Sequence, residues 1–161
     1  MFHLVPTKHS IKNIQDEKKI ISESLGHLSN LHYDVGGEVF LMEKDLNALK
    51  IKNFTYNGKA PDMYFLVGKS GRPLRENGDA ILSYPTSQKT FDVNDENAQM
   101  QDRAFKGEEI ILRVPKDTKI FEYNWFSIYC RKYNRNFGSI YFPWKEWRGL
   151  FFIFYVLYVS S

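Results

Sequence analysis

The sequence has very little cysteine: Cys130 is the one thiol among its 161 residues. No intrachain disulfide can form, and a zinc site built from several cysteines is excluded. The first ten residues also lack the basic start and the apolar run of about 7–15 residues that a signal peptide needs. These absences predict either a cytosolic chain or an extracellular one whose own N-terminus lies upstream of Met1.

The chain also lacks an apolar run long enough to span a membrane. Residues 150–159 are all apolar, but a spanning helix needs about 20 such residues. Three interpretations stay open for this run: a final buried strand, a truncated span, or sequence foreign to the natural protein. We therefore expect residues 144–161 to form an atypical tail, and we predict no membrane span.

The chain also lacks a large excess of charge of either sign: it has 22 basic and 19 acidic residues, which give a net charge of +3. Such a balance does not require a nucleic acid or an anionic surface as a partner. Aromatic residues are abundant, at 16% of the chain, and hydrophobic residues make up 43%. This composition predicts a sizeable core and favours strands over helices.

The apolar pattern has a period of two over most of the chain, which is typical of strands that are buried on one face. Turn residues separate these strands, and no regular helical pattern lies between them. We predict an all-β fold, an antiparallel β-sandwich or a jelly-roll-like single domain. The predicted strands are residues 35–41, 49–52, 63–67, 80–84, 110–114, 120–130 and 139–142.

The domain is expected to span residues 25–143. Residues 1–24 form a short N-terminal extension, and residues 11–25 carry a helical pattern that Gly26 would end. Residues 86–107 are polar without a clear period, which predicts an excursion over the surface.

Cys130 is the sharpest candidate for a functional residue. Phe126, Ile128 and Cys130 fall on one face of the predicted strand, and this apolar face should point inward. A thiol buried in this way is inert. The alternatives are a redox thiol in a pocket and a haem ligand, which would need a cavity of about 300–1,000 Å³ beside the sulfur.

A second candidate is the N-glycosylation motif at Asn53, Phe54 and Thr55. Alternation places Asn53 on the same face as Leu49 and Ile51, which should be buried. A glycan at Asn53 would therefore require the strand to end or to bulge first.

The remaining candidates are weaker. Pro61 and Asp62 are interpreted as a structural turn. Two of the four histidines, His27 and His32, are candidate metal ligands, but they have no helical metal spacing and are expected to lie on the surface. Flat sugar faces could stack on a platform made by Trp125, Trp144 and Trp147.

Residues 135–142 partly fit an RNA-recognition pattern, although Ser139 stands where that pattern has a stacking aromatic residue. A single-stranded RNA-binding domain is therefore the third functional alternative, and no nucleic-acid partner is expected.

Six segments of the chain form a recognisable set. They are VGGEVF at 35–40, LKIKNFTYNG at 49–58, APDMYFLVGK at 60–69, IILRVP at 110–115, WFSIYCR at 125–131 and NFGSI at 136–140. Together they resemble the DM-thirteen domain, an extracellular module of Skeletor- and Knickkopf-type proteins; they appear in the family's order and cover about residues 25–143. Three positions depart from the family pattern: Tyr129 replaces a Trp, Asn57 an Asp and Ala60 a Gly.

The resemblance implies a non-catalytic extracellular or cell-surface module that takes part in matrix or cuticle organisation, with chitin as the polysaccharide. It implies DOMON-type or other neighbouring domains in a longer protein. It also implies a redox role or haem binding at Cys130. The second alternative is therefore a haem- or thiol-based electron-transfer component that acts on surface proteins or polysaccharide.

Overall fold

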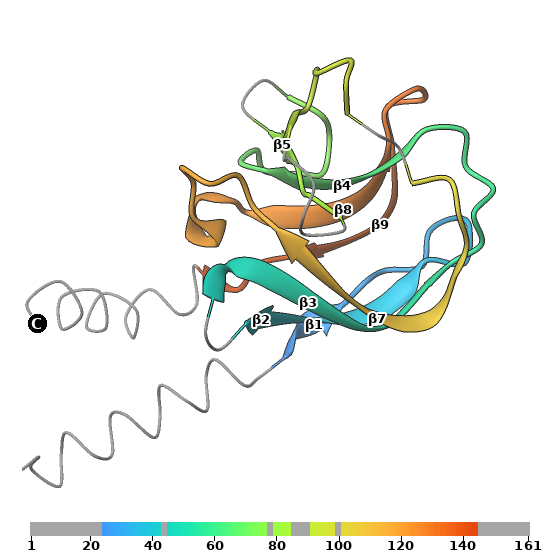
Figure 1. Ribbon diagram of the computed structural model, residues 1–161, viewed down its shortest axis with the longest axis horizontal. Helices are drawn as coiled ribbons and strands as arrows, with labels where there is room; N and C mark the ends of the chain where they lie inside the picture. Colours follow the sequence, from blue (N-terminus) through green and yellow to red (C-terminus); the bar gives the residue numbers. More distant parts are fainter. Residues whose placement is uncertain (1–23, 43–44, 77–78, 85–90, 99–100, 145–161) are drawn as a thin grey trace, which may run out of the picture.

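The computed structural model describes residues 24–42, 45–76, 79–84, 91–98 and 101–144. Within these residues, the strands form two antiparallel sheets, and the all-β prediction is confirmed (Figure 1). The strands are β1 (Ser24–His27), β2 (Gly36–Met42), β3 (Asp45–Tyr56), β4 (Met63–Gly68), β5 (Ala80–Ile81), β6 (Phe91–Asp92), β7 (Phe105–Arg113), β8 (Trp125–Cys130) and β9 (Arg135–Tyr141).

The two sheets are packed face to face as a sandwich. The four-stranded sheet has the order β1-β2-β3-β7, and the five-stranded sheet has the order β6-β5-β4-β8-β9 (Figure 1). Alternation along β3 works as expected, because Leu49 and Ile51 are fully buried while Lys52 is exposed. The residues that point between the sheets form one apolar core, in which the rings of Phe54, Phe65, Phe105 and Phe126 pack against one another.

Backbone hydrogen bonds tie the two sheets together at both sides of the sandwich. Residues 28–32 cross from β1 to β9, where the N–H of Ser29 donates to Ser139 O at 3.1 Å. On the other side, Ser83 and Arg113 exchange backbone hydrogen bonds of 3.1 and 3.4 Å. A Cβ at Gly138 would lie 2.3 Å from Ser29 O, so the crossing requires glycine there. These bridges cover strand edges that would otherwise be open to pairing.

A second, smaller apolar cluster covers the outer face of the five-stranded sheet. Strands β4 and β8 are consequently buried along their whole length on both faces. The prediction that residues 86–107 only skirt the surface is wrong at Val93 and Ala98, which are buried because the large rings of this outer face need cover. The cluster consists of Tyr64, Leu66, Ile81, Val93, Ala98, Trp125 and Tyr129.

Three further expectations about elements are corrected. Ser24, Leu25 and Gly26 do not end a helix but lie in β1, which pairs with β2; residues 11–23 of the expected helix lie outside the described part. Residues 120–122 form a short 3-10 helix, η1 (Ile120–Glu122), where a strand was predicted. Trp144, the first residue of the predicted tail, is part of the core, and the rest of the tail lies outside the described residues.

Among the described residues, no helix is long and apolar enough to cross a membrane.

Candidate functional site

Cys130 is the last residue of β8 and lies between two neighbouring strands. It pairs with Met63 on β4 and with Arg135 on β9. Its side chain belongs to the core between the sheets, together with Phe126 and Ile128, as the alternation predicts. The thiol is free and its residue is 0% exposed.

The surroundings of Cys130 do not fit a haem. A haem-thiolate ligand needs a cavity of about 300–1,000 Å³ beside the sulfur. The exposed fraction of Cys130 is 0%, so no space of the size of a water molecule lies against this residue. Its strand partner Met63 and its face neighbour Ile128 are equally enclosed. The thiol therefore has apolar neighbours where a macrocycle would have to lie.

Two tyrosines lie near the thiol in the same core. Tyr56, at the end of β3, is 1% exposed, and its hydroxyl accepts a hydrogen bond of 3.0 Å from the N–H of Ala60. Burial raises the pKa of Tyr56 above its usual value, and charge interactions with Tyr33 and Cys130 act in the same direction. Tyr33 is half-buried, packs against the core cluster and meets the ring of Phe137 at a tilt of 59°, with ring centroids 4.5 Å apart. Tyr56 interacts electrostatically with both Cys130 and Tyr33, so the three residues form an interaction row in the order Cys130, Tyr56, Tyr33.

Sequence reasoning did not find this row, because its members come from three separate parts of the chain. Tyr56 lies in the segment at 49–58 that carries the family resemblance, at the end of a predicted strand with one apolar face. That position was the feature of the sequence that could have indicated a buried phenol. Tyr33 lies in a loop and carries a positive φ of 59°, which no periodicity predicts.

Arg131 points to the opposite face of the five-stranded sheet, away from the thiol. Its guanidinium donates to the hydroxyl of Tyr64 at 2.8 Å and to Asp95 O at 2.7 Å. Its Nε lies 3.8 Å from Oδ2 of Asp62, and its backbone N–H donates to Asp62 O at 3.1 Å. These contacts give Asp62 a structural partner, while Pro61 beside it is exposed.

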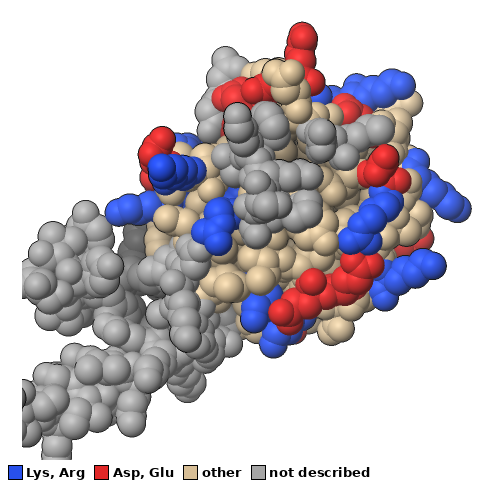
Figure 2. Space-filling model, viewed as in Figure 1, with Lys and Arg blue, Asp and Glu red and all other residues tan. Residues whose placement is uncertain are grey.

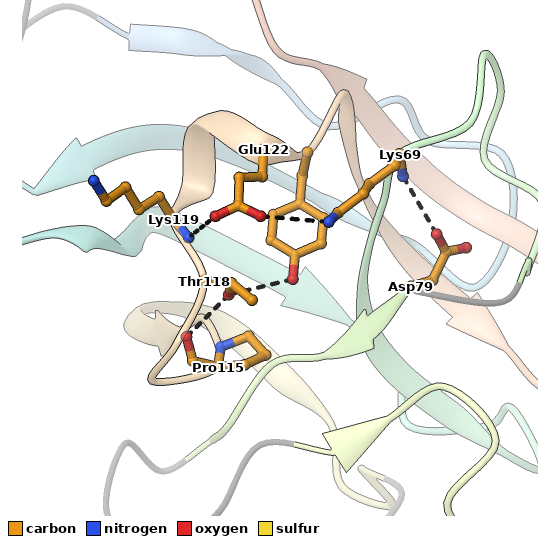
Figure 3. A network of polar contacts seen from close by, with 7 residues as sticks. Lys69, Asp79, Pro115, Thr118, Lys119 and Glu122 are labelled. Atoms are coloured by element: carbon orange, nitrogen blue, oxygen red, sulfur yellow. Dashed lines mark hydrogen bonds and ion pairs between the residues drawn. The ribbon is translucent and has the colours of Figure 1, made fainter. Parts of the chain in front are cut away.

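A polar network holds the loop after β4 against η1 (Figure 3). Nζ of Lys69 lies 3.4 Å from Oε2 of Glu122 and 5.3 Å from the ring centroid of Tyr123. The backbone N–H of Lys69 donates to Asp79 at 3.3 Å, and burial raises the pKa of that carboxyl. Glu122 also accepts from the N–H of Lys119 and so caps the helix. Each group in this network has a structural partner.

The tryptophans expected to stack on sugars are enclosed. Trp125 is fully buried, and its indole N–H donates to Ser70 Oγ at 3.2 Å. Trp144 is 7% exposed, and its N–H donates to Tyr123 O at 2.9 Å. Neither ring presents a face to solvent, and Trp147 lies outside the described residues.

Asn53 is exposed, so the expectation that it lies on the buried face of β3 is wrong. The register of β3 against β7 shifts between Ile51 and Phe54, and both Lys52 and Asn53 are exposed. This bulge inserts one extra residue, and Asn53 has a φ of 51°.

The histidines do not gather into a metal site. Nε2 of His27 lies 3.7 Å from Glu38, and the ring of His32 meets Phe137 edge-on at 6.1 Å. In the part of the chain that the structure describes, no cluster of three or more His, Cys, Asp or Glu could hold a metal ion.

The surface carries charges of both signs. On the face that Figure 2 shows, basic and acidic side chains alternate over the tan surface without a field of one sign. Arg103 and Glu108 form an ion pair at 2.8 Å. Phe137 and Phe142, the aromatic residues at the stacking positions of the RNA-like segment, are 1% and 7% exposed and cannot stack on a base. The described residues therefore give RNA binding no support.

The family model described as Electron transfer DM13 matches residues 27–142. The chain belongs to this DM13 family. Protein Skeletor, isoforms B/C, of Drosophila melanogaster is 32% identical over 119 residues, which are 74% of this chain and 14% of the relative. Isoforms D/E give the same identity over 7% of their length. No solved structure matches.

The DM13 domain is thus a small part of the Skeletor proteins that it matches, which have room for other domains. One departure from the family pattern now has a structural context. The hydroxyl of Tyr129, where the family usually has Trp, donates to Asn134 at 2.7 Å and accepts from the N–H of Arg75 at 3.2 Å. Tyr129 thereby ties the loop that contains Arg75 to the outer face of β8.

Proposed function

We propose that this DM13 domain is an electron-transfer module of a longer extracellular protein, and that the Cys130 thiol is its redox group. The observation that carries the proposal is the position of Cys130, enclosed in the core beside Tyr56, which interacts with both the thiol and the half-buried Tyr33. Burial makes the thiol inert toward dissolved reagents and denies it a second thiol, so the exchange open to it is electron exchange through neighbouring residues. The family description supports the same chemistry.

The proposed step is a one-electron oxidation. Tyr33, which is half-buried, gives one electron to the oxidant and its hydroxyl proton to water. A hydrogen atom then passes from Tyr56 to Tyr33, and the S–H bond of Cys130 breaks as its hydrogen atom passes to Tyr56. A thiyl radical remains on the sulfur, and a one-electron oxidant on a partner domain is reduced. Because neither phenol is consumed, each returns to its starting state when the electron has passed.

An oxidative titration tests the redox role. The purified chain is titrated with a one-electron, outer-sphere oxidant, and radicals are followed by electron paramagnetic resonance. We expect the first oxidation to disappear in Cys130→Ala and to become slower in Tyr33→Phe. Tyr133→Phe is the matched control, because that ring is 61% exposed and lies outside the core cluster. An unchanged first oxidation in Cys130→Ala would refute the role of the thiol.

A binding test addresses the cofactor separately. After incubation with haem, we expect no Soret band from the folded chain, because the packing around Cys130 leaves no room. A stoichiometric band that is lost in Cys130→Ala would instead make the residue a haem ligand.

For the setting of the module, we propose matrix or cuticle organisation, beside DOMON-type or other domains. The supporting observation is the small share of the Skeletor relatives that the chain covers. Retention on insoluble chitin measures the polysaccharide role directly. Retention no greater than that of an unrelated protein of similar charge would remove chitin as the ligand.

A further inference from the structure

We propose that Asn53 is a site of N-linked glycosylation on the outer face of the four-stranded sheet. The inference rests on the extracellular setting proposed above, because the modification occurs in the secretory pathway. Asn53, Phe54 and Thr55 form the single Asn-x-Ser/Thr motif of the sequence. A motif of this length occurs by chance, so the argument depends on where the fold places it.

The bulge in β3 turns Asn53 outward. Without the extra residue, alternation would direct its side chain between the sheets, together with Ile51. With the extra residue, Lys52 and Asn53 are both exposed, and Phe54 returns to the core at 0% exposure. The strand bulge that a glycan at Asn53 was expected to require is therefore present.

The surroundings of Asn53 leave its amide available. Within the residues that the structure describes, the Asn53 side chain makes no hydrogen bond. The strand residue facing the bulge from β2 is Gly37, which lies in the register shift between Gly36 and Glu38; its added Cβ would lie 2.8 Å from Ile51 Cγ2, so the bulge packs closely against bare backbone there. Thr55 donates to Asp34 O at 2.8 Å, so the motif stays ordered around the acceptor.

The order of the strands also favours attachment of the oligosaccharide to Asn53 before folding is complete. Strand β3 needs β7 as its second neighbour, and β4, β5 and β6 come between them in the chain. Pairing between distant segments is slow, because the loop entropy must be lost before the contacts form. The motif thus remains accessible while the rest of the domain emerges, and the finished fold accommodates the product.

The chemical step is a group transfer. The bond between C1 of the first sugar and the pyrophosphate of a lipid-linked oligosaccharide breaks, and a bond from C1 to Nδ2 of Asn53 forms. One amide proton leaves with the lipid pyrophosphate. No oxidant or reductant takes part.

The motif residues also have structural explanations of their own. Asn tolerates a positive φ better than most residues, and the Thr55 hydroxyl holds the loop at Asp34. For this reason the test must measure attached carbohydrate and not stability.

The experiment delivers the chain to the lumen of microsomes with an added signal peptide and an added C-terminal acceptor tripeptide. We expect two oligosaccharides per translocated chain, both removed by peptide-N-glycosidase, with Asn53 converted to Asp. Asn53→Gln should carry one, and Thr55→Ser should carry two because it keeps the hydroxyl. A wild-type chain glycosylated only on the added tripeptide would overturn the proposal.

Forced delivery separates this inference from the proposed function. If Cys130 shows no redox activity, or if the natural protein is not exported, acceptance of a glycan at Asn53 is still measured. If Asn53 is refused, the redox titration is unaffected, because it follows radicals and does not depend on attached carbohydrate.

Discussion

The two sheets of this domain treat their outer faces in different ways. On the four-stranded sheet, the outer face of β3 carries Lys50 and Lys52, which lie in or near water. On the five-stranded sheet, the outer face of β8 carries Trp125 and Tyr129, which are at most 1% exposed. Loops between β4 and β7 supply the cover for the second face. One sandwich therefore contains a sheet with a solvated side and a sheet that is buried on both sides.

This difference between the two sheets shows where a redox group can be shielded from water. A side chain on the inner face of the four-stranded sheet is separated from water by a single layer of backbone. Cys130 ends the strand that has apolar cover on both faces. The small cluster that hides Trp125 and Tyr129 is thus part of the environment of the thiol, although it lies on the other side of the sheet.

The largest expected effect compares large-to-small substitutions across the two sheets. Trp125→Ala on the outer face of β8 should cost about 3–5 kcal/mol of unfolding free energy, as much as Phe126→Ala on its inner face, because both rings are fully buried. Lys52→Ala, on the outer face of β3, should change it by about 0.5 kcal/mol or less. Denaturant unfolding followed by circular dichroism measures all three.

The contrast between the two outer faces would be refuted if Trp125→Ala lost no more unfolding free energy than Lys52→Ala. That result would mean that the covering loops contribute nothing to stability and that the outer cluster opens readily. Matching costs at Trp125 and Phe126 would instead establish the cover as part of the folded core.

A smaller effect is expected where a crossing segment ties the sheets together. Gly138→Ala places a Cβ 2.3 Å from Ser29 O, so residues 28–32 must move away from β9, at a cost of about 1–3 kcal/mol. The amide of Ser29, now bonded to Ser139 O, should lose protection from hydrogen exchange. Gly71→Ala is the control, because nothing lies within 4 Å of its added Cβ. Equal stability and protection in both variants would argue against the close packing at Gly138.

The centre of the four-stranded sheet could be predicted from the sequence, but its edge strand β1 was not, since Ser24 and Leu25 were expected to end a helix. Leu49, Lys50, Ile51 and Lys52 alternate in the sequence and in burial, because one face of β3 stands against the core and the other against water. The bulge at Asn53 could not be predicted, because a one-residue shift of register is set by the partner strands and leaves no local pattern.

The five-stranded sheet was predictable only in part. Strands β4, β5, β8 and β9 were found, at least in part, as short apolar runs, whereas β6 was not, and the inner face of β8 with Cys130 followed from alternation. The residues that cover its outer face could not be predicted, because Val93 and Ala98 are isolated apolar residues in a polar segment without a period. The row from Cys130 through Tyr56 to Tyr33 was missed for a related reason: only tertiary packing brings three separate elements together.

The smallest expected effect concerns alkaline pH and the outer cluster. Burial, followed by a hydrogen bond to Asp62, raises the pKa of Tyr64 from 10.0 to about 12. The stability that Tyr64 contributes is therefore present below about pH 10 and is lost as the pH rises toward about 12, because the unfolded chain ionises first. Tyr64→Phe should make the fall in unfolding midpoint between these pH values less steep, whereas Tyr133→Phe, at a 61% exposed position, should leave the slope unchanged. A slope that stays the same in Tyr64→Phe would show that this hydroxyl is not held neutral by the cover, and would place the cluster closer to the solvated behaviour of the other sheet.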